Sequence, residues 1–406
     1  MRRETTTCCI AGGGPAGMMA GLLLARQGIE VMVLEKHADF LRDFRGDTIH
    51  PATLQLLAEL GMIEEFLQLP HTKMPRIIME TPTGPTTFAD FTRWTGPYGY
   101  IAFVPQWDFL NFIARKAEAY PSFRLITRAE VTGLIEENGQ NVGVHASTPE
   151  GPLEVHAKLV VGADGRHSAV RKNAGLESIA CTPLMDVLWL RLRRNPDEQL
   201  PFFRNRNGRF LVSINRGDYW QLSYLIPLQG FEAVKQVGLP AFQASIAACV
   251  PALADRVGEL ASWDDVKLLS VRVDRLRQWY RPGLLCIGDA AHAMSPAGGV
   301  GINLAIQDAV AMANILGPTF RSGGPMLSAL RRVQRRRELP TRLVQAFQLR
   351  ALGSLYPKAS ASSAGDSGTS IPLAFRLMRY VPALRHAFGW FIGRGIRPEH
   401  IPPRPG

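Results

Sequence analysis

The 406-residue sequence predicts an α/β fold: a Rossmann-like domain interleaved with a mixed β-sheet domain and followed by a helical C-terminal region. Three observations support this prediction. The chain opens with a strand, a glycine-rich turn, a helix and a second strand, which is a β-turn-α-β unit. Short strands and turn residues dominate 76–103 and 181–269, and helical patterning dominates the last third. The nucleotide-binding unit is therefore assembled from segments that lie far apart in the sequence.

The glycines of the first β-turn-α-β unit stand where a dinucleotide-binding turn requires them. A strand over Thr5–Ala11 precedes the turn, a helix over Ala16–Arg26 follows it, and Gly28 ends that helix. A second strand, Glu30–Leu34, ends at Glu35. The first glycine of GxGxxG permits a tight turn, the second admits a pyrophosphate and the third lets the helix pack closely. The motif residues and the acid that can bind a ribose diol are Gly12, Gly14, Pro15, Ala16, Gly17 and Glu35, with Lys36 beside it.

Later elements follow from pattern and turn chemistry. Helices are predicted over 51–60, 106–120 and 241–260, and strands over 125–161 and 283–287, with a further helix starting near Ile302. The Asn138-Gly139 pair marks a turn between two of the strands. Residues 359–370 are rich in Ser, Gly and Ala and are expected to form a flexible loop.

Composition narrows the functional classes. No apolar run approaches the roughly 20 residues of a membrane-spanning helix, and the two N-terminal arginines are followed by no export signal, so a cytoplasmic protein is expected. Five cysteines without CxxC spacing argue against a dithiol centre and a zinc site, and no metal is expected. The net charge of +11 includes a basic cluster at 331–337, which is interpreted as a solvated helix face, with no nucleic-acid partner.

Two further glycine motifs follow apolar strands. One runs from Gly162 through Asp164 and Gly165 to Arg171, and the other runs from Gly288 and Asp289 through His292 to Asn303. Together with the first turn, these motifs resemble the class A flavoprotein monooxygenases, typified by para-hydroxybenzoate hydroxylase, over residues 5–316. The segments 44–51 and 395–400 resemble a subgroup of these enzymes.

The resemblance implies bound FAD, transient NAD(P)H, and a division of the chain. The FAD-binding domain would comprise 1–75, 101–180 and 270–316, the substrate domain 76–100 and 181–269, and the helical region 317–406. Asp289 would bind the ribityl chain, Arg45 and Gln106 the pyrophosphate and ribityl regions, and a helix N-terminus the flavin's pyrimidine edge. The cofactor residues implied by the family motifs are Arg45, Gln106, Asp164, Gly165, Gly288, Asp289, Pro296, Gly298, Gly299, Gly301, Ile302 and Asn303.

The implied activity is hydroxylation or epoxidation of an aromatic substrate with O2, through a flavin C4a-hydroperoxide. The candidate catalytic residues are Asp47, Tyr224 and Pro296, and each of the first two has an alternative role. Asp47 could sit at a helix N-terminus, and Tyr224 shares its strand face with Trp220 as either a pocket roof or plain sheet core. His50 is expected at a helix cap.

Other functional classes stay open at this point. A flavin-dependent halogenase is disfavoured because the stretch 222–227 replaces both tryptophans of the WxWxIP motif. A reductase or dehydrogenase of a lipid-like substrate is the main alternative. The segment 371–392 combines large apolar side chains with arginines, so it is either a peripheral membrane element or a helix packed on the FAD domain. The sequence leaves the oligomeric state undetermined.

Overall fold

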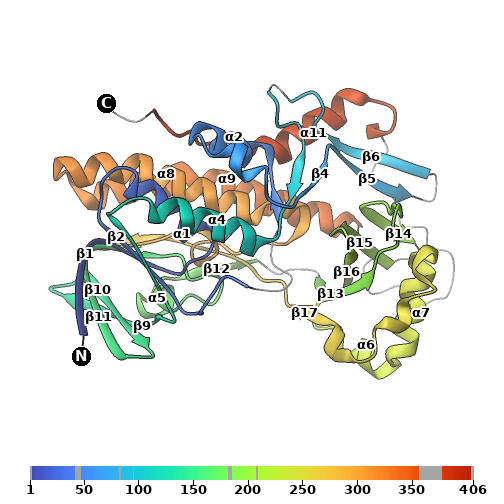
Figure 1. Ribbon diagram of the computed structural model, residues 1–406, viewed down its shortest axis with the longest axis horizontal. Helices are drawn as coiled ribbons and strands as arrows, with labels where there is room; N and C mark the ends of the chain where they lie inside the picture. The colour runs from blue at the N-terminus through green and yellow to red at the C-terminus, as the bar shows by residue number, and fades with distance from the viewer. Residues whose placement is uncertain are drawn as a thin grey trace.

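The computed structural model describes residues 2–41, 47–81, 84–94, 96–181, 185–206, 209–355 and 377–403. Two large β-sheets lie toward opposite ends of the molecule, and the long helices α8 (Gly301–Ser322) and α9 (Met326–Leu355) run above the first of them (Figure 1). The predicted Arg45, the Ser- and Gly-rich loop at 359–370 and the start of the segment 371–392 lie outside the described residues. The arrangement is the predicted α/β fold with a second sheet and a helical C-terminal region.

The first sheet has the strand order β19–β20–β11–β1–β2–β8. Five adjacent strands of this sheet run parallel to one another: β20, β11, β1, β2 and β8. Parallel strands end at the same edge, so the turns after β1, β11 and β20 meet there. Cys8, Cys9 and Cys286 are buried in this sheet as free thiols. The strands are β1 (Arg2–Ala11), β2 (Val31–Glu35), β8 (Phe123–Thr127), β9 (Glu130–Glu137), β10 (Gln140–Thr148), β11 (Gly151–Gly162), β19 (Tyr280–Arg281) and β20 (Leu284–Cys286).

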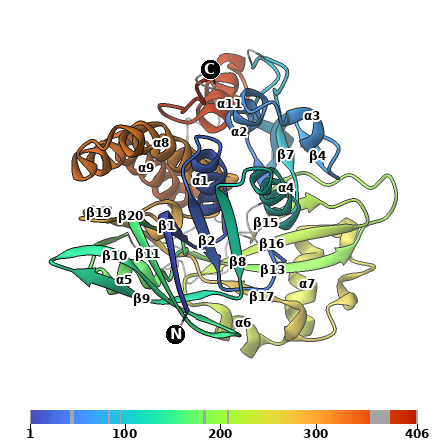
Figure 2. The same ribbon diagram turned by 60° about the vertical axis from the view of Figure 1, so that its left-hand side comes forward.

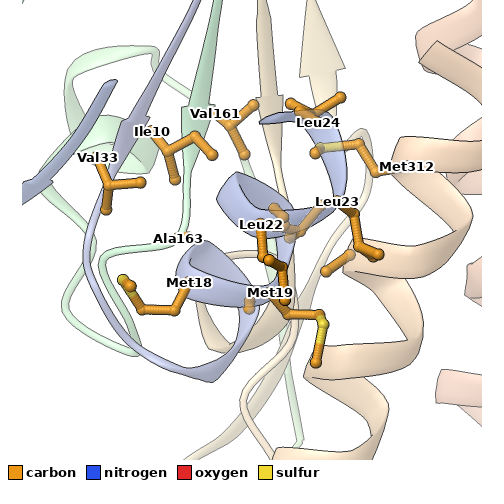
Figure 3. Close-up of a cluster of buried hydrophobic side chains, with 14 of the residues drawn as sticks. Ile10, Met18, Met19, Leu22, Leu23, Leu24, Val33, Val161, Ala163 and Met312 are labelled. Carbon is orange, nitrogen blue, oxygen red and sulfur yellow. The ribbon is translucent and has the colours of Figure 1, made fainter. Parts of the chain in front are cut away.

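Helix α1 (Pro15–Ala25) is apolar on every side because it is enclosed on every side. Pro15 occupies the first turn, where a missing N–H costs nothing. The methionine and leucine side chains of α1 pack between the first sheet and Met312 of α8 (Figure 3). Helix α4 (Gln106–Glu118) packs against α1 as well, so α1 holds the glycine-rich turn at its N-terminus in a fixed place.

The second sheet has the order β17–β13–β16–β15–β14–β5–β6 and is antiparallel except between β14 and β5. One face packs on α7 (Leu239–Cys249). That helix was predicted to reach Leu260, but it ends early because Pro251 cannot continue it. The strands are β5 (Arg76–Thr81), β6 (Gly84–Asp90), β13 (Met185–Arg193), β14 (Phe203–Arg206), β15 (Arg209–Asn215), β16 (Tyr219–Pro227) and β17 (Lys267–Leu269), and α6 (Phe231–Val237) precedes α7.

Small elements join the two sheets. A three-stranded sheet of β3, β7 and β4 lies beside helices α2 and α3, and a β12–β18 pair connects the sheets elsewhere. Helix α11 (Pro382–Arg394) lies beside α2 (Figure 2) and packs on β6, where Gly389 faces the Asp90 backbone too closely to allow a side chain. The bounds are α2 (Pro51–Glu59), α3 (Ile63–Phe66), α5 (Ala169–Asn173), β3 (Thr48–Ile49), β4 (Thr72–Met74), β7 (Ile101–Phe103), β12 (Ser178–Cys181) and β18 (Val273–Leu276).

One helical stretch, Ala297–Ser322, is long and apolar enough to cross a membrane by length and composition. It contains α8, and 72% of its apolar window is buried inside the protein. Its apolar character is therefore explained by its position in the core, between α1 and α9.

Candidate active site

A cavity of about 580 Å³ opens between the turns of the first sheet and one face of the second sheet. Residues predicted separately from three motifs meet on its wall. The described predicted residues that line it are Gly12, Gly14, Pro15, Ala16, Glu35, Lys36, Asp47, Gln106, Asp164, Gly165, Asp289, Pro296, Gly298, Gly299, Gly301, Ile302 and Asn303. The cavity therefore joins the dinucleotide-type groove to the second sheet.

The first glycine turn has the geometry that a pyrophosphate requires. Gly12 has φ +103°, and a Cβ there would lie 2.5 Å from the Ala163 carbonyl oxygen. No atom of the described residues lies within 4 Å of the place where a Cβ on Gly14 would stand, and Gly14 lines the cavity. Gly14 also caps α1 without a side-chain hydrogen bond, which leaves the helix N–H groups for an anion. Gly17 does not line the cavity; it lies directly against Gly12, in the packing role predicted for it.

Glu35 at the end of β2 braces this turn. Its Oε2 accepts a 2.8 Å hydrogen bond from the Gly13 N–H, and its Oε1 accepts one of 3.0 Å from the His37 N–H. The side chain is buried and lies on the cavity wall. This placement suits an acid that accepts hydrogen bonds from a ribose.

The two aspartates of the later motifs face the same groove. Asp164 Oδ2 accepts a 3.1 Å hydrogen bond from the Val170 N–H, whereas its buried Oδ1 has no partner within the described part of the chain. Burial raises the pKa of Asp164, and its hydrogen bonds oppose that rise. Asp289 is partly exposed and lies 3.9 Å from Arg166. Arg171, at the end of the same motif as Asp164, is buried against Asp274 and does not line the cavity.

The glycine loop before α8 is fixed by hydrogen bonds to β3. The Thr48 hydroxyl donates to the Gly299 carbonyl at 2.8 Å, and Asn303 Nδ2 donates to the Thr48 carbonyl at 2.9 Å. Gly298 and Gly299 both have positive φ, and a Cβ on Gly299 would collide with Thr48. Gly288 does not line the cavity, but its positive φ and its contact with Ala16 make it a packing glycine. The loop thus presents the N-terminus of α8 to the cavity in a rigid form.

Asp47 forms an ion pair and also lies at the N-terminus of α4, but it does not begin the helix that follows it in the sequence. It precedes β3, and α2 begins only at Pro51. One carboxylate oxygen pairs with Arg216, and the other accepts a 3.2 Å hydrogen bond from the Gln106 N–H. Burial lowers the pKa of Arg216 to about 10. Arg216 was not recognised from the sequence, because its partner lies 169 residues away in the chain.

Tyr224 lies on the face of the second sheet that is turned away from the cavity. Its ring packs against Phe242 of α7, and its hydroxyl is 3.3 Å from Ser245 Oγ. Burial raises the pKa of Tyr224. The alternation along β16 was correctly recognised, but the cavity faces Ser223 and Leu225 instead. The sheet-core interpretation fits this placement, and the catalytic assignment of Tyr224 does not.

A network of buried charged side chains links the segment before the glycine loop to α8 and α9. His292 Nε2 lies 2.5 Å from Asp308, and Arg337 Nε donates to Asp308 at 3.0 Å. Burial would raise the pKa of Asp308, but the His292 and Arg337 contacts lower it overall. Arg337 also reaches Glu399 at 3.3 Å, so the network ties the C-terminal tail to the loop. The prediction that 331–337 forms a solvated face therefore holds for Arg331, Arg332 and Arg335, which are exposed, and is wrong for Arg337.

His50 caps α2, as predicted, and lies on the cavity wall. Its Nδ1 is 3.0 Å from the Ile392 carbonyl of α11, and its backbone N–H donates to Asn303 at 2.9 Å. Burial lowers the pKa of His50 to about 4. A neutral His50 thus links the glycine loop to α11.

Comparisons with known proteins agree with this geometry. Residues 4–346 match the family model described as "FAD binding domain". The chain is 36% identical over 315 residues to a 6-methylpretetramide 4-monooxygenase of Streptomyces rimosus, covering 77% of this chain and 75% of that protein. It is 29% identical over 330 residues to a 12-dehydrotetracycline 5-monooxygenase/anhydrotetracycline 6-monooxygenase of Streptomyces rimosus subsp. rimosus, covering 78% of this chain but only 63% of that protein. The myxobacterial chondrochloren halogenase CndH shares the fold, with a TM-score of 0.76, 20% identity, and 99% and 98% of the two chains covered.

The fold and the site define an FAD-dependent oxidoreductase of the Rossmann type. The chain belongs to the class A flavoprotein monooxygenases, which use FAD and NAD(P)H. The residues fit the cofactor. Gly14 with its open backbone, Asp164 with an Oδ1 that lacks a partner among the described residues, and Gly301 at the uncapped start of α8 all line one cavity. Bound FAD supplies electron transfer from NAD(P)H and activation of O2. The chain's own contribution is to hold that group, to exclude water and to position a substrate.

Proposed function

We propose that this chain introduces one oxygen atom into a neutral, fused-ring aromatic compound. The observation that carries the proposal is the chemistry of the second sheet's cavity face. The described residues of 185–271 that line the cavity carry no charge, and most are aromatic or branched: Met185, Val187, Trp189, Phe202, Phe203, Phe210, Val212, Ile214, Ser223, Leu225, Leu269 and Val271. A flat apolar wall of this kind favours a polycyclic substrate over a small carboxylic acid.

The names of the two relatives support the proposal, since one is a monooxygenase of 6-methylpretetramide and the other of 12-dehydrotetracycline and anhydrotetracycline. Pro296 lies at the loop between this wall and the flavin groove, so it is proposed to border the reacting carbon. Asp47 is proposed to support Gln106 and the glycine loop rather than to act as a base, because both of its oxygens are already engaged.

The experiment is turnover under ¹⁸O2 with NADH or NADPH, against a panel of phenols, quinolones and polycyclic aromatics that includes anhydrotetracycline. Mass spectrometry of the product decides the outcome. One labelled oxygen in a polycyclic product is expected. Product formed at full rate without O2 would reject the proposal in favour of a reductase or dehydrogenase, and turnover of simple phenols alone would reject the fused-ring substrate.

Helix α11 and the residues just before it carry exposed apolar side chains that concern contact with a membrane. One side of α11 packs on β6, and its residues Phe388 and Phe391 reach the cavity wall. Tyr380, which precedes α11, is 75% exposed, and Leu384 and Trp390 of α11 are 39% and 50% exposed. We propose a cytoplasmic enzyme in which this exposed side makes peripheral contact with anionic membranes. Co-sedimentation with vesicles of anionic and of neutral lipid, at varied salt, tests this contact, and equal sedimentation with both would reject it.

A further inference from the structure

The buried face of α9 is polar. Its residues Gln334, Arg337, Thr341, Gln345 and Gln348 recur at helical spacing, and each is at most 8% exposed. A buried polar stripe is costly unless each group finds a hydrogen-bond partner. In α9 the partners are mostly backbone carbonyls of the segment 274–297, which contains the loop of the cavity.

Two members of this stripe, Arg337 and Gln348, line the cavity, and Arg337 is already paired with Asp308. Gln348 Nε2 donates to the Ser295 carbonyl at 2.9 Å and to the Ala297 carbonyl at 2.8 Å, on either side of Pro296. Both partners are acceptors, so the amide nitrogen must face them and the Oε1 must point away. That Oε1 is buried and has no hydrogen-bond partner among the residues that the structure describes.

The surroundings of this oxygen suggest what it binds. Gln348 lines the cavity together with Phe347 and Val344 of α9, beside Phe391 of α11. A buried carbonyl-type oxygen without a donor is costly, and the cost is removed by a ligand that brings a hydroxyl or N–H group. A flat aromatic with a ring hydroxyl supplies such a donor and an apolar body.

We propose that Gln348 is a positioning and specificity residue: its amide nitrogen fixes the loop around Pro296, and its Oε1 accepts a hydrogen bond from a hydroxyl group on the aromatic substrate. This inference rests on the proposed function for the nature of the substrate. In this proposal a residue of α9, a helix outside the three cofactor motifs, orients the substrate.

Gln345 provides a matched control on the same helix. Its Nε2 donates to the Asp274 and Ala293 carbonyls, both at 2.8 Å, so it anchors the same segment. Its Oε1 is engaged by Arg275 at 3.4 Å, and it does not line the cavity. Replacing Gln345 tests the anchoring role without touching the proposed ligand contact.

The test is calorimetric titration of the FAD-loaded enzyme with 2-naphthol and with 2-methoxynaphthalene, which lacks the hydroxyl donor. The wild-type protein is expected to bind 2-naphthol about tenfold more tightly, the effect of one buried hydrogen bond. Gln348→Met, which keeps the side-chain volume, is expected to reduce the preference to less than about twofold. Gln345→Met is expected to lower the melting temperature while keeping the tenfold preference.

Gln348→Glu keeps an oxygen acceptor and removes the amide donors, so it is expected to retain the preference and lose loop stability. If Gln348→Met does not fold, the comparison of 2-naphthol with 2-methoxynaphthalene on the wild-type and Gln345→Met proteins decides the question. Equal weakening of both ligands in Gln348→Met, loss of the preference in Gln345→Met, or no preference in the wild-type protein would each overturn the proposal. Failure of the wild-type protein to bind either naphthalene or to yield labelled product would instead overturn the proposed function, and this inference with it.

Discussion

Replacing Asp47 tests whether the Asp47–Arg216 pair is a structural tether. Asp47 directly precedes β3, which contacts the glycine loop, and Arg216 lies in the turn between β15 and β16. The pair therefore connects β3 to the second sheet. The two side chains are only 8% and 6% exposed. In Asp47→Asn the amide oxygen can still accept the Gln106 N–H, but the guanidinium loses its counter-charge.

Breaking a buried pair by removing one partner costs about 3 to 5 kcal/mol, because the remaining charge is uncompensated. Urea denaturation of Asp47→Asn, followed by fluorescence, is expected to show a loss of that size. Arg216→Met introduced into the Asp47→Asn protein is expected to recover most of it, since the buried charge is then gone.

An exposed pair provides the control. Lys235 and Glu232 lie 2.9 Å apart on α6, with side chains 36% and 76% exposed. Glu232→Gln is expected to cost less than about 1 kcal/mol. The tether interpretation is refuted if Asp47→Asn costs no more than Glu232→Gln, or if the double variant is no more stable than Asp47→Asn. A catalytic Asp47 would instead give normal stability with a selective loss of product formation.

Three further outcomes are expected. Asp289→Ala should lower the ratio of flavin to protein absorbance after purification, because the ribityl chain loses an ionised acceptor, and full occupancy would contradict this role. Gly12→Ala should abolish FAD binding or folding, because the added Cβ collides with Ala163. Gly139→Ala, at an open turn with φ +75°, should lower the free energy of unfolding by only about 1 kcal/mol. Equal effects of the two substitutions would show that the contact with Ala163 is unimportant. His50 has a folded-state pKa of about 4, so between pH 6.5 and 4 the unfolded state binds more protons and stability falls as pH falls. Burial of neutral His50 lowers the free energy of unfolding by about 2 to 3 kcal/mol near pH 4.5 relative to neutral pH, and His50→Gln should remove this part of the pH dependence. Urea denaturation at a series of pH values measures it, and an unchanged pH profile in His50→Gln would show that other groups cause the loss of stability.

The cofactor half of the site could be predicted because its signals are local. A glycine with positive φ, a following helix and an acid at the next strand end occupy about 25 consecutive residues. Each later motif likewise follows an apolar strand, and parallel strands bring their ends to one edge. The resemblance to known flavoproteins then supplied the roles of Asp164 and Asp289, and the structure places both on the cavity wall.

The substrate half could be predicted less well, because its signals are not local. Alternation along β16 shows that the strand has two faces, but not which face meets the cavity. The structure puts α7 against Trp220 and Tyr224 and leaves Ser223 and Leu225 to the cavity. The choice is made by α7, which packs through side chains such as Phe242 and Ile246 that follow β16 in the sequence.

The buried position of Arg337 shows why composition alone is a poor guide to burial. The arginines of 331–337 gave that segment the appearance of a solvated helix face. Irregular backbone near a cavity has carbonyls that no sheet or helix satisfies, and a glutamine amide can serve two of them at once. Gln345 and Gln348 do this for Ala293, Ser295 and Ala297, so the polar face of α9 is buried because the loop requires donors. The shape of the loop before α8, and with it the position of Pro296, is therefore set by a helix that carries none of the cofactor motifs.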